Sequence, residues 1–387
     1  MTNKKRKVCV VITARPSYSR IKTALLAIQA HPDLELQLVV AASALLDRYG
    51  SSVNYIEKDG FTITAKVFNV LEGENLTAAA KTTGIGILEL STVFENLNPD
   101  VVVTIADRFE TMATAISATY MNIPLAHVQG GEVTGNIDEK VRHAITKLAD
   151  LHFVASPLAK ERVIKMGENP KKVFLTGCPS IDLAKEILNE KNKDFNPFNI
   201  YSGVGEKLDL SKGYIIVMQH PVTTEYLLAR IQIEETLDAI MEIGKPTLWF
   251  WPNVDAGADG TSKGIRTYRE YKDTSNIHFF KNMEPEHFLK LLINSDCLIG
   301  NSSVGIRECG YLGVPVVNIG SRQAGREKGQ NIIDCDYNKK NIIDSINTQL
   351  KNGHCEPDKI YGDGLAGVKI SNLLATEELS FDKKLSY

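Results

Sequence analysis

The stretch Asn98–Ile145, NPDVVVTIADRFETMATAISATYMNIPLAHVQGGEVTGNIDEKVRHAI, predicts the fold of this 387-residue chain. Its apolar run Val101–Ile105 is too uniform for a strand with one wet face, so we expect a parallel-sheet strand buried on both faces. A helix over Glu110–Tyr120 follows, and then a second buried strand, Leu125–Val128. The order strand, helix, strand, Gly-Gly turn and helix is typical of an α/β sheet.

Polar and acidic residues follow both predicted strands. Asp107 and Arg108 come after the first strand, and the turn Gln129–Glu132 comes after the second, with Asp138 a little further along the chain. Open α/β sheets bind ligands outside the carboxyl ends of their strands. The sequence therefore predicts a site where these two strands end.

Composition and charge favour a protein that acts on small molecules. The chain is 43% hydrophobic and 24% charged, and its net charge of −3 gives no sign of a nucleic-acid or membrane-surface partner. No apolar run is long enough to span a bilayer, and Val8–Ile12 is too short for a signal-peptide core. Its six cysteines form no C-x-x-C pair. We interpret them as reduced packing residues of a cytoplasmic protein.

The length and the pattern of elements predict two α/β domains. The strand and helix pattern restarts after a polar segment rich in Lys, Asn, Asp, Pro and Gly, which is typical of an inter-domain linker. We therefore expect an N-terminal domain over residues 1–190, a linker over 191–212, a C-terminal domain over 213–360, and a C-terminal helix and tail over 361–387.

Several turns carry residues suited to phosphate. Arg15 and Ser19 follow the first strand, at a strand-to-helix turn. In the second predicted domain, four strands end in polar clusters that we interpret as a diphosphate pocket; they contain His220, Asn253, Ser302 with Ser303, and Arg322. Glu308 lies slightly further on. Its carboxylate would be repelled by a phosphate, whereas it could accept hydrogen bonds from the hydroxyls of a ribose diol.

The first predicted domain contributes three acids, Asp107, Glu132 and Asp138, without clustered His or Cys that would complete a metal site. Carboxylates of this kind suit proton transfer on a sugar. An alternative remains open for Asp107, since it could be the salt-bridge partner of Arg108 or the cap of the helix that follows.

These residues resemble the hydrolysing UDP-N-acetylglucosamine 2-epimerases along nearly the whole chain. The matching motifs are Arg15-Pro-Ser-Tyr-Ser, Asp107-Arg-Phe-Glu, Gly130-Gly-Glu, Ile137-Asp138, Arg142-His-Ala-Ile-Thr-Lys-Leu, Gln219-His-Pro-Val-Thr-Thr, Pro252-Asn-x-Asp-Ala-Gly, Gly300-Asn-Ser-Ser, Arg307-Glu and Arg322-Gln-x-Gly-Arg. The resemblance implies two Rossmann-like doubly wound domains facing across a cleft, as in GT-B enzymes. It also implies no metal, no nicotinamide or other cofactor, and a homodimer or homotetramer.

The reaction implied by the resemblance is elimination of UDP to a 2-acetamidoglucal, followed by hydration to N-acetylmannosamine for sialic-acid-type pathways. The resemblance places one set of residues around the UDP-sugar: Arg15, Ser19, Arg108, Asn253, Ser302, Ser303, Glu308 and Arg322. It assigns proton transfer to Asp107, Glu132 and Asp138, and makes His220 a catalytic candidate beside the leaving diphosphate.

Gln129 departs from the family pattern, because many members carry a carboxylate there and an amide does not exchange a proton usefully near neutral pH. We assign it to substrate recognition, either of a sugar hydroxyl or of an acetamido group at C4. Four alternatives stay open: a hydrolysing epimerase for a UDP-2,4-diacetamido-2,4,6-trideoxy sugar, a non-hydrolysing epimerase, a glycosyltransferase of the same fold, and an inactive nucleotide-sugar sensor.

Overall fold

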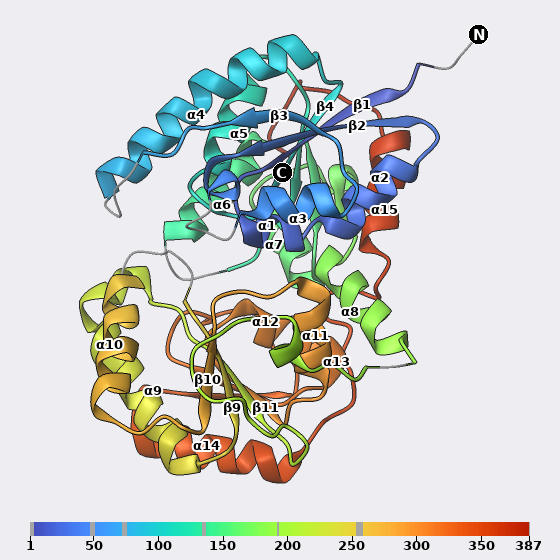
Figure 1. Ribbon diagram of the computed structural model, residues 1–387. Helices are drawn as coiled ribbons and strands as arrows, with labels where there is room; N and C mark the ends of the chain where they lie inside the picture. Colours follow the sequence, from blue (N-terminus) through green and yellow to red (C-terminus); the bar gives the residue numbers. More distant parts are fainter. Residues whose placement is uncertain are drawn as a thin grey trace. The chain divides into compact units, whose positions relative to one another are not determined.

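The computed structural model describes residues 4–46, 51–71, 76–133, 137–191, 193–252 and 258–386. These residues fall into two compact units (Figure 1). The first comprises the described residues up to 133 together with 137–183 and 361–386, and the second comprises the described residues of 184–360. No helix in the described part of the chain is long and apolar enough to cross a membrane.

The first unit contains a seven-stranded parallel sheet in the order β3-β2-β1-β4-β5-β6-β7. Its strands are β1 (Arg6–Ile12), β2 (Leu34–Ala41), β3 (Ile63–Val67), β4 (Val101–Ile105), β5 (Leu125–Val128), β6 (Leu151–Val154) and β7 (Val173–Leu175). Strands β4 and β5 have the predicted bounds, and every residue in them is buried. This confirms the prediction from the two apolar runs, since covering both faces of a sheet requires apolar residues at every position.

Helices connect these strands and cover the sheet. They are α1 (Arg15–Ser19), α2 (Lys22–Ala30), η1 (Ala42–Leu45), α3 (Ser52–Lys58), α4 (Leu76–Leu97), α5 (Thr111–Tyr120), α6 (Ile137–Leu148), α7 (Pro157–Lys165), η3 (Pro170–Lys172) and α15 (Ala366–Thr376). Helix α8 (Pro179–Asn189) begins in the first unit, and its residues from Ala184 onward belong to the second. The chain order reverses between the neighbouring strands β1 and β4. Such a reversal marks the edge at which doubly wound sheets bind ligands.

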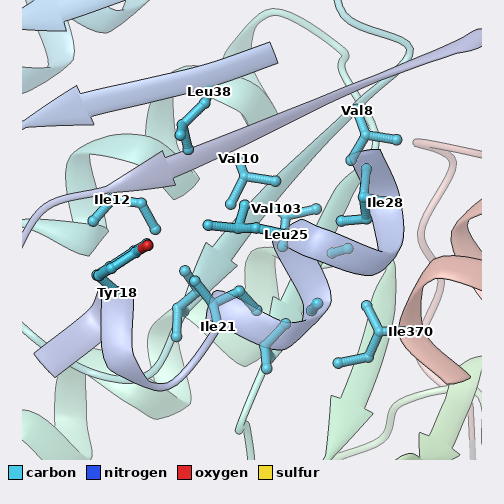
Figure 2. Packing of buried hydrophobic residues seen from close by; sticks show 14 of the residues in the cluster. Val8, Val10, Ile12, Tyr18, Ile21, Leu25, Ile28, Leu38, Val103 and Ile370 are labelled. Carbon is cyan, nitrogen blue, oxygen red and sulfur yellow. The ribbon is translucent and has the colours of Figure 1, made fainter. Parts of the chain in front are cut away.

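The C-terminal helix α15 belongs to the first unit, whereas the sequence predicted a separate element over 361–387. It packs beside α2, and Figure 2 shows Ile370 facing the cluster that contains Leu25 and Ile28. A Cβ on Gly367 would lie 2.7 Å from the backbone of Thr23, so glycine permits this close approach. Asp182 caps the helix, because its carboxylate accepts hydrogen bonds from the backbone N–H groups of Ala366 and Gly367, at 2.8 and 2.7 Å.

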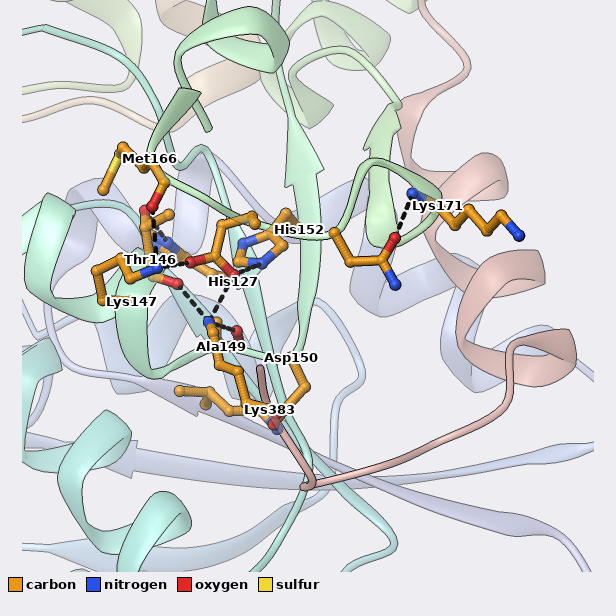
Figure 3. A network of polar contacts seen from close by, with 12 residues as sticks. His127, Thr146, Lys147, Ala149, Asp150, His152, Met166, Lys171 and Lys383 are labelled. Carbon is orange, nitrogen blue, oxygen red and sulfur yellow. Dashed lines mark hydrogen bonds and ion pairs between the residues drawn. The ribbon is translucent and has the colours of Figure 1, made fainter. Parts of the chain in front are cut away.

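The tail after α15 is held by a buried carboxylate, Glu168, that accepts hydrogen bonds from three side chains (Figure 3). The donors are Lys147 Nζ at 2.5 Å, Lys383 Nζ at 2.6 Å and His152 Nε2 at 3.0 Å. Burial raises the pKa of Glu168, but these hydrogen bonds outweigh it and lower the pKa to about 2. Lys383 also donates to the carbonyl oxygens of Thr146 and Ala149, at the end of α6.

The second unit contains a six-stranded parallel sheet in the order β10-β9-β8-β11-β12-β13. Its strands are β8 (Ile215–Met218), β9 (Thr247–Phe250), β10 (Ile277–Phe280), β11 (Cys297–Gly300), β12 (Val316–Ile319) and β13 (Ile332–Cys335). Its helices are η4 (Pro197–Asn199), η5 (Thr223–Leu228), α9 (Ala229–Ile243), α10 (Ala258–Tyr271), α11 (Pro285–Ile293), α12 (Ser303–Ile306), α13 (Glu308–Leu312) and α14 (Lys339–Asn352). Here the chain order reverses between β8 and β11, so the two predicted doubly wound folds are confirmed.

The described residues of segment 191–212 pack within the second unit, whereas the sequence predicted a linker there. Phe195 stacks on His287 with ring centroids 4.5 Å apart, and the Tyr201 hydroxyl lies 2.8 Å from His287 Nδ1. Val204 forms an antiparallel bridge with Phe279 of β10. The segment is polar on average, but a few aromatic residues and the Val204 bridge hold it against the second unit.

We predict that Ile370→Ala destabilises the first unit by roughly 2–5 kcal/mol, because the fully buried side chain would leave a cavity between α15 and α2. Val368→Ala is the matched control on the same helix, since Val368 is 52% exposed and its truncation should change stability by less than about 0.5 kcal/mol. Urea unfolding followed by circular dichroism measures both. Equal midpoints for the two variants would contradict the packing of α15 described above.

Candidate active site

The carboxyl ends of β4 and β5 bring two of the predicted acids to one cation, Arg142. This residue lies on α6, has none of its surface exposed, and donates a hydrogen bond from Nη2 to Asp107 Oδ2. Its Nη1 lies 3.8 Å from Glu132 Oε2. Asp107 and Glu132 are also buried, so the guanidinium and the two carboxylates share a desolvated site in which charges must compensate one another.

The position of Arg142 decides which arginine pairs with Asp107. The sequence left open that Asp107 pairs with Arg108, but Arg108 Nε lies 3.2 Å from Glu110 Oε2 and Asp107 pairs with Arg142. Glu110, and not Asp107, occupies the N-cap position of α5. The third acid, Asp138, lies in the first turn of α6, on the helix that carries Arg142. Asp107 is thus fixed by a cation that comes from another element.

Two glycines shape the turn that carries Glu132. Gly131 has φ +77°, and a Cβ there would lie 2.3 Å from the carbonyl oxygen of Ala159. A Cβ on Gly130 would lie 2.9 Å from Thr146 Oγ1 and 3.0 Å from His127 Nδ1. The turn is therefore pressed against both α6 and α7, and a side chain at either glycine would displace Glu132.

Gln129 is fully buried and adopts a left-handed backbone, with φ +69°. Its Nε2 donates a hydrogen bond to Cys178 Sγ at 2.9 Å, and that sulfur lies 3.0 Å from Ser180 Oγ. Gln129 Oε1 has no hydrogen-bond partner among the described residues. For the substrate contact that the sequence predicts, this amide therefore offers Oε1 as an acceptor, and one of its two N–H groups is already used by Cys178.

The predicted anion-binding turn after β1 is itself a short helix, α1, which begins at Arg15. The Ser19 hydroxyl donates to the carbonyl oxygens of Pro16 and Arg15, at 3.3 and 3.4 Å. Ser19 therefore bonds back to its own helix, whereas Arg15 follows β1 on the same sheet edge as Asp107.

In the second unit, Asn301 links three neighbouring strand ends. Its Oδ1 accepts from the backbone N–H of His220 at 2.7 Å, and its Nδ2 donates to the His220 carbonyl at 2.8 Å. Its own carbonyl oxygen accepts from Arg322 Nη1 at 3.2 Å and from Gln323 Nε2 at 2.8 Å. Since β8, β11 and β12 are adjacent, His220 and Arg322 lie on the sheet edge at which the sequence predicted a diphosphate pocket.

The other predicted residues of the second unit surround this edge. Ser302 Oγ caps α12 by accepting from Val304 N, and Ser303 is the first residue of that helix. Glu308 begins α13, and its Oε2 is buried without a hydrogen-bond partner in the described part of the chain. A buried carboxylate oxygen of this kind can accept from a ligand hydroxyl. Asn253 lies outside the described residues.

Sequence reasoning did not single out Arg142 or Asn301 as individual site residues. Arg142 follows Asp138 by one helical turn, and Val141 and Ile145 beside it indicate a buried helix face. This spacing is the feature of the sequence that indicates a buried arginine near Asp138. Asn301 lies within the motif Gly300-Asn-Ser-Ser, and its role in joining strand ends depends on sheet order. Among the described residues, no three His, Cys, Asp or Glu side chains form a metal-binding group.

This chain belongs to the UDP-N-acetylglucosamine 2-epimerase family, whose sequence model matches residues 26–375. The UDP-N,N'-diacetylbacillosamine 2-epimerase (hydrolyzing) of Legionella pneumophila is 34% identical over 371 residues, which cover 96% of each chain. The UDP-N-acetylglucosamine 2-epimerase of Neisseria meningitidis is 31% identical over 360 residues, which cover 93% of this chain and 91% of that one. The chain is therefore an enzyme of the hydrolysing UDP-sugar 2-epimerase type.

The fold is also that of solved members of the family. The crystal structure of Methanocaldococcus jannaschii UDP-GlcNAc 2-epimerase in complex with UDP-GlcNAc and UDP matches with a TM-score of 0.78, at 17% identity, over 96% of this chain and 100% of that one. This likeness, together with the two parallel sheets, confirms the predicted GT-B-like fold.

We predict that Arg142→Met costs roughly 3–5 kcal/mol of stability at pH 8, because it strands two buried carboxylates without a cation. Arg230→Met is the control, since the Arg230–Glu234 pair is exposed and should contribute less than about 1 kcal/mol. The deficit of Arg142→Met should shrink as the pH falls toward 5, because protonation of one carboxylate removes the repulsion. Urea unfolding at both pH values measures this, and a deficit independent of pH would refute the charge assignment.

Proposed function

We propose that this enzyme hydrolyses UDP-N-acetylglucosamine with inversion at C2, releasing UDP and N-acetylmannosamine. In the first step a base removes the C2 proton, the C1–O bond breaks, and UDP leaves with the bonding electrons, which gives a 2-acetamidoglucal. In the second step water adds, with hydroxyl at C1 and a proton at C2 from the opposite face. Family membership supports the reaction class, and the acids of the first unit support the chemistry.

The observation that carries the proposal is the Arg142 site at the ends of β4 and β5. A guanidinium beside a buried carboxylate favours its ionised form, so Asp107 is equipped to act as a base near neutral pH. Glu132 lies on the other side of the same cation, and Asp138 begins the helix that carries it. We assign C2 proton abstraction to Asp107, and water positioning or proton return to Glu132 or Asp138.

The second unit supplies groups for the leaving diphosphate. His220 and Arg322 are joined through Asn301 on one sheet edge, where they can meet charge that grows on the β-phosphate as the C1–O bond breaks. The remaining predicted contacts with UDP in this unit are Asn253, Ser302, Ser303 and Glu308. Those from the first unit are Arg15, Ser19 and Arg108.

A second substrate is favoured by a specific observation. The Legionella relative named for UDP-N,N'-diacetylbacillosamine is 34% identical, and the Neisseria relative named for UDP-N-acetylglucosamine is 31% identical. A UDP-2,4-diacetamido-2,4,6-trideoxy sugar is therefore the alternative substrate. Both reactions release UDP, which separates them from a non-hydrolysing epimerase that would keep the nucleotide attached. We also propose a homodimer or homotetramer, which light scattering would measure.

We predict that the enzyme converts at least one of the two UDP-sugars to free UDP and the free 2-epimer in the presence of EDTA and without nicotinamide. In D2O the product must carry deuterium at C2, because the original C2 proton is lost during elimination. NMR of the products with each sugar measures both points, and Asp107→Asn provides the variant without the base. Product that retains hydrogen at C2 would exclude the mechanism, and preference for the diacetamido sugar would replace the proposed substrate.

We predict that His220→Ala and Arg322→Ala each lower the single-turnover rate at saturating substrate by about 10²–10³-fold, because each removes a donor aimed at developing charge. Arg230→Ala is the control, as its guanidinium pairs with Glu234 on the surface of the same unit. Rapid-quench measurement of UDP release gives the rates. Rates close to wild type for both site variants would confine these residues to binding or to structure.

A further inference from the structure

His127 of β5 contacts the backbone that holds Asp107, although the proposed chemistry does not use it. Its side chain is fully buried, and Nε2 lies 2.9 Å from the carbonyl oxygen of Ala106. A carbonyl only accepts hydrogen bonds, so Nε2 carries the proton. Ala106 has φ +62°, a left-handed conformation that costs energy in a residue with a Cβ and needs support from its surroundings.

The other ring nitrogen reaches α6. Nδ1 lies 3.2 Å from Thr146 Oγ1, and because Nε2 is the donor, Nδ1 accepts from that hydroxyl (Figure 3). Thr146 follows Arg142 by one turn of the helix, and Gly130 packs against both Thr146 and His127. One imidazole therefore touches the strand end that carries Asp107, the helix that carries Arg142, and the turn that carries Glu132.

The charge state of the ring suits this role. Burial lowers the pKa of His127 to about 3, although the Ala106 hydrogen bond and the charge of Glu132 act in the opposite direction. His152 and Lys383 add to the lowering. The imidazole is thus neutral at any working pH, so one nitrogen is always a donor and the other always an acceptor.

We infer that His127 is a positioning residue of the epimerase reaction, which fixes the Asp107 carboxylate against Arg142 by bonding the Ala106 carbonyl and Thr146 at the same time. The inference rests on the proposed function, in which Asp107 is the C2 base. A misplaced base slows proton abstraction at saturating substrate, whereas the phosphate contacts of the second unit are untouched. The expected consequence is a loss in kcat with KM little changed.

Three variants separate the two hydrogen bonds. His127→Gln can place an amide N–H near the position of Nε2 and keep the bond to Ala106, His127→Asn can only reach toward Thr146, and His127→Leu removes both. We expect kcat to fall about 100-fold in the Leu and Asn variants and to recover to within about tenfold of wild type in the Gln variant. KM should change less than about threefold in all of them.

The matched control is His152→Leu. His152 pairs with His127 in the register of β5 and β6, is equally buried, and bonds to Glu168 instead of to the Asp107 strand end. Its loss should lower the melting temperature as much as His127→Leu does, with kcat within about threefold of wild type. Equal kcat in wild type and His127→Leu, or equal losses in His127→Leu and His152→Leu, would overturn the inference and leave His127 a packing residue.

A measurement that needs no turnover separates failure of the inference from failure of the proposed function. In a long-range ¹⁵N–¹H correlation spectrum, assigned by its absence from His127→Asn, the ring should show the Nε2–H tautomer with no titration between pH 5 and 9. An Nδ1–H tautomer, or a titration in that range, would overturn the inference whatever the activity. Absence of UDP release by the wild type from either sugar, with the expected tautomer present, would refute the proposed function instead.

Discussion

The first unit depends on one electrostatic constraint, the complete burial of the Arg142 guanidinium. A desolvated cation is tolerated only where carboxylates meet it at close range, and Asp107 and Glu132 come from the ends of different strands. The pairing therefore requires β4 beside β5 and α6 packed over their carboxyl ends. The same arrangement places the two acids beside a cation in a site from which water is largely excluded. If these acids transfer protons as proposed, stability of the sheet edge and the chemistry of the site share one cause.

Much of this edge was predictable because its signals are local. Because β4 and β5 are buried on both faces, their sequences are apolar runs. Asp107-Arg108 and Gly130-Gly131-Glu132 follow those runs within a few residues. Arg142 and His127 were not predictable in the same way. An arginine on an amphipathic helix resembles a surface residue until the helix is rotated onto its sheet, and a histidine within an apolar strand gives no sign of which carbonyl it bonds. Both roles depend on which strands are neighbours.

The two units have other bounds than the predicted domains for a related reason. Residues 191–212 carry the polar composition of a linker, yet Phe195 and Tyr201 hold the segment against His287 of the second unit. The overall composition of a segment does not reveal a few aromatic residues of this kind, although the packing of the segment depends on them. The C-terminal helix packs on α2, more than three hundred residues earlier in the chain, through Gly367 and Ile370. No local pattern encodes the partner of a helix at that separation.

The two units also show why the same topology does not determine the chemistry. Both sheets reverse their chain order between central strands, but acids follow β4 and β5 of the first sheet, whereas amide, hydroxyl and guanidinium groups follow β11 and β12 of the second. Substrate choice needs a further distinction. Gln129 Nε2 donates one of its two N–H groups to Cys178, and Oε1, which has no hydrogen-bond partner among the described residues, is the acceptor that this amide offers a sugar. A C4 hydroxyl and the N–H of a C4 acetamido group are both donors, so this contact cannot tell the two candidate sugars apart. The two sugars also differ at C6, where the trideoxy sugar lacks a hydroxyl. Discrimination therefore requires either a hydrogen bond to the C6 hydroxyl or space around the larger C4 acetamido group.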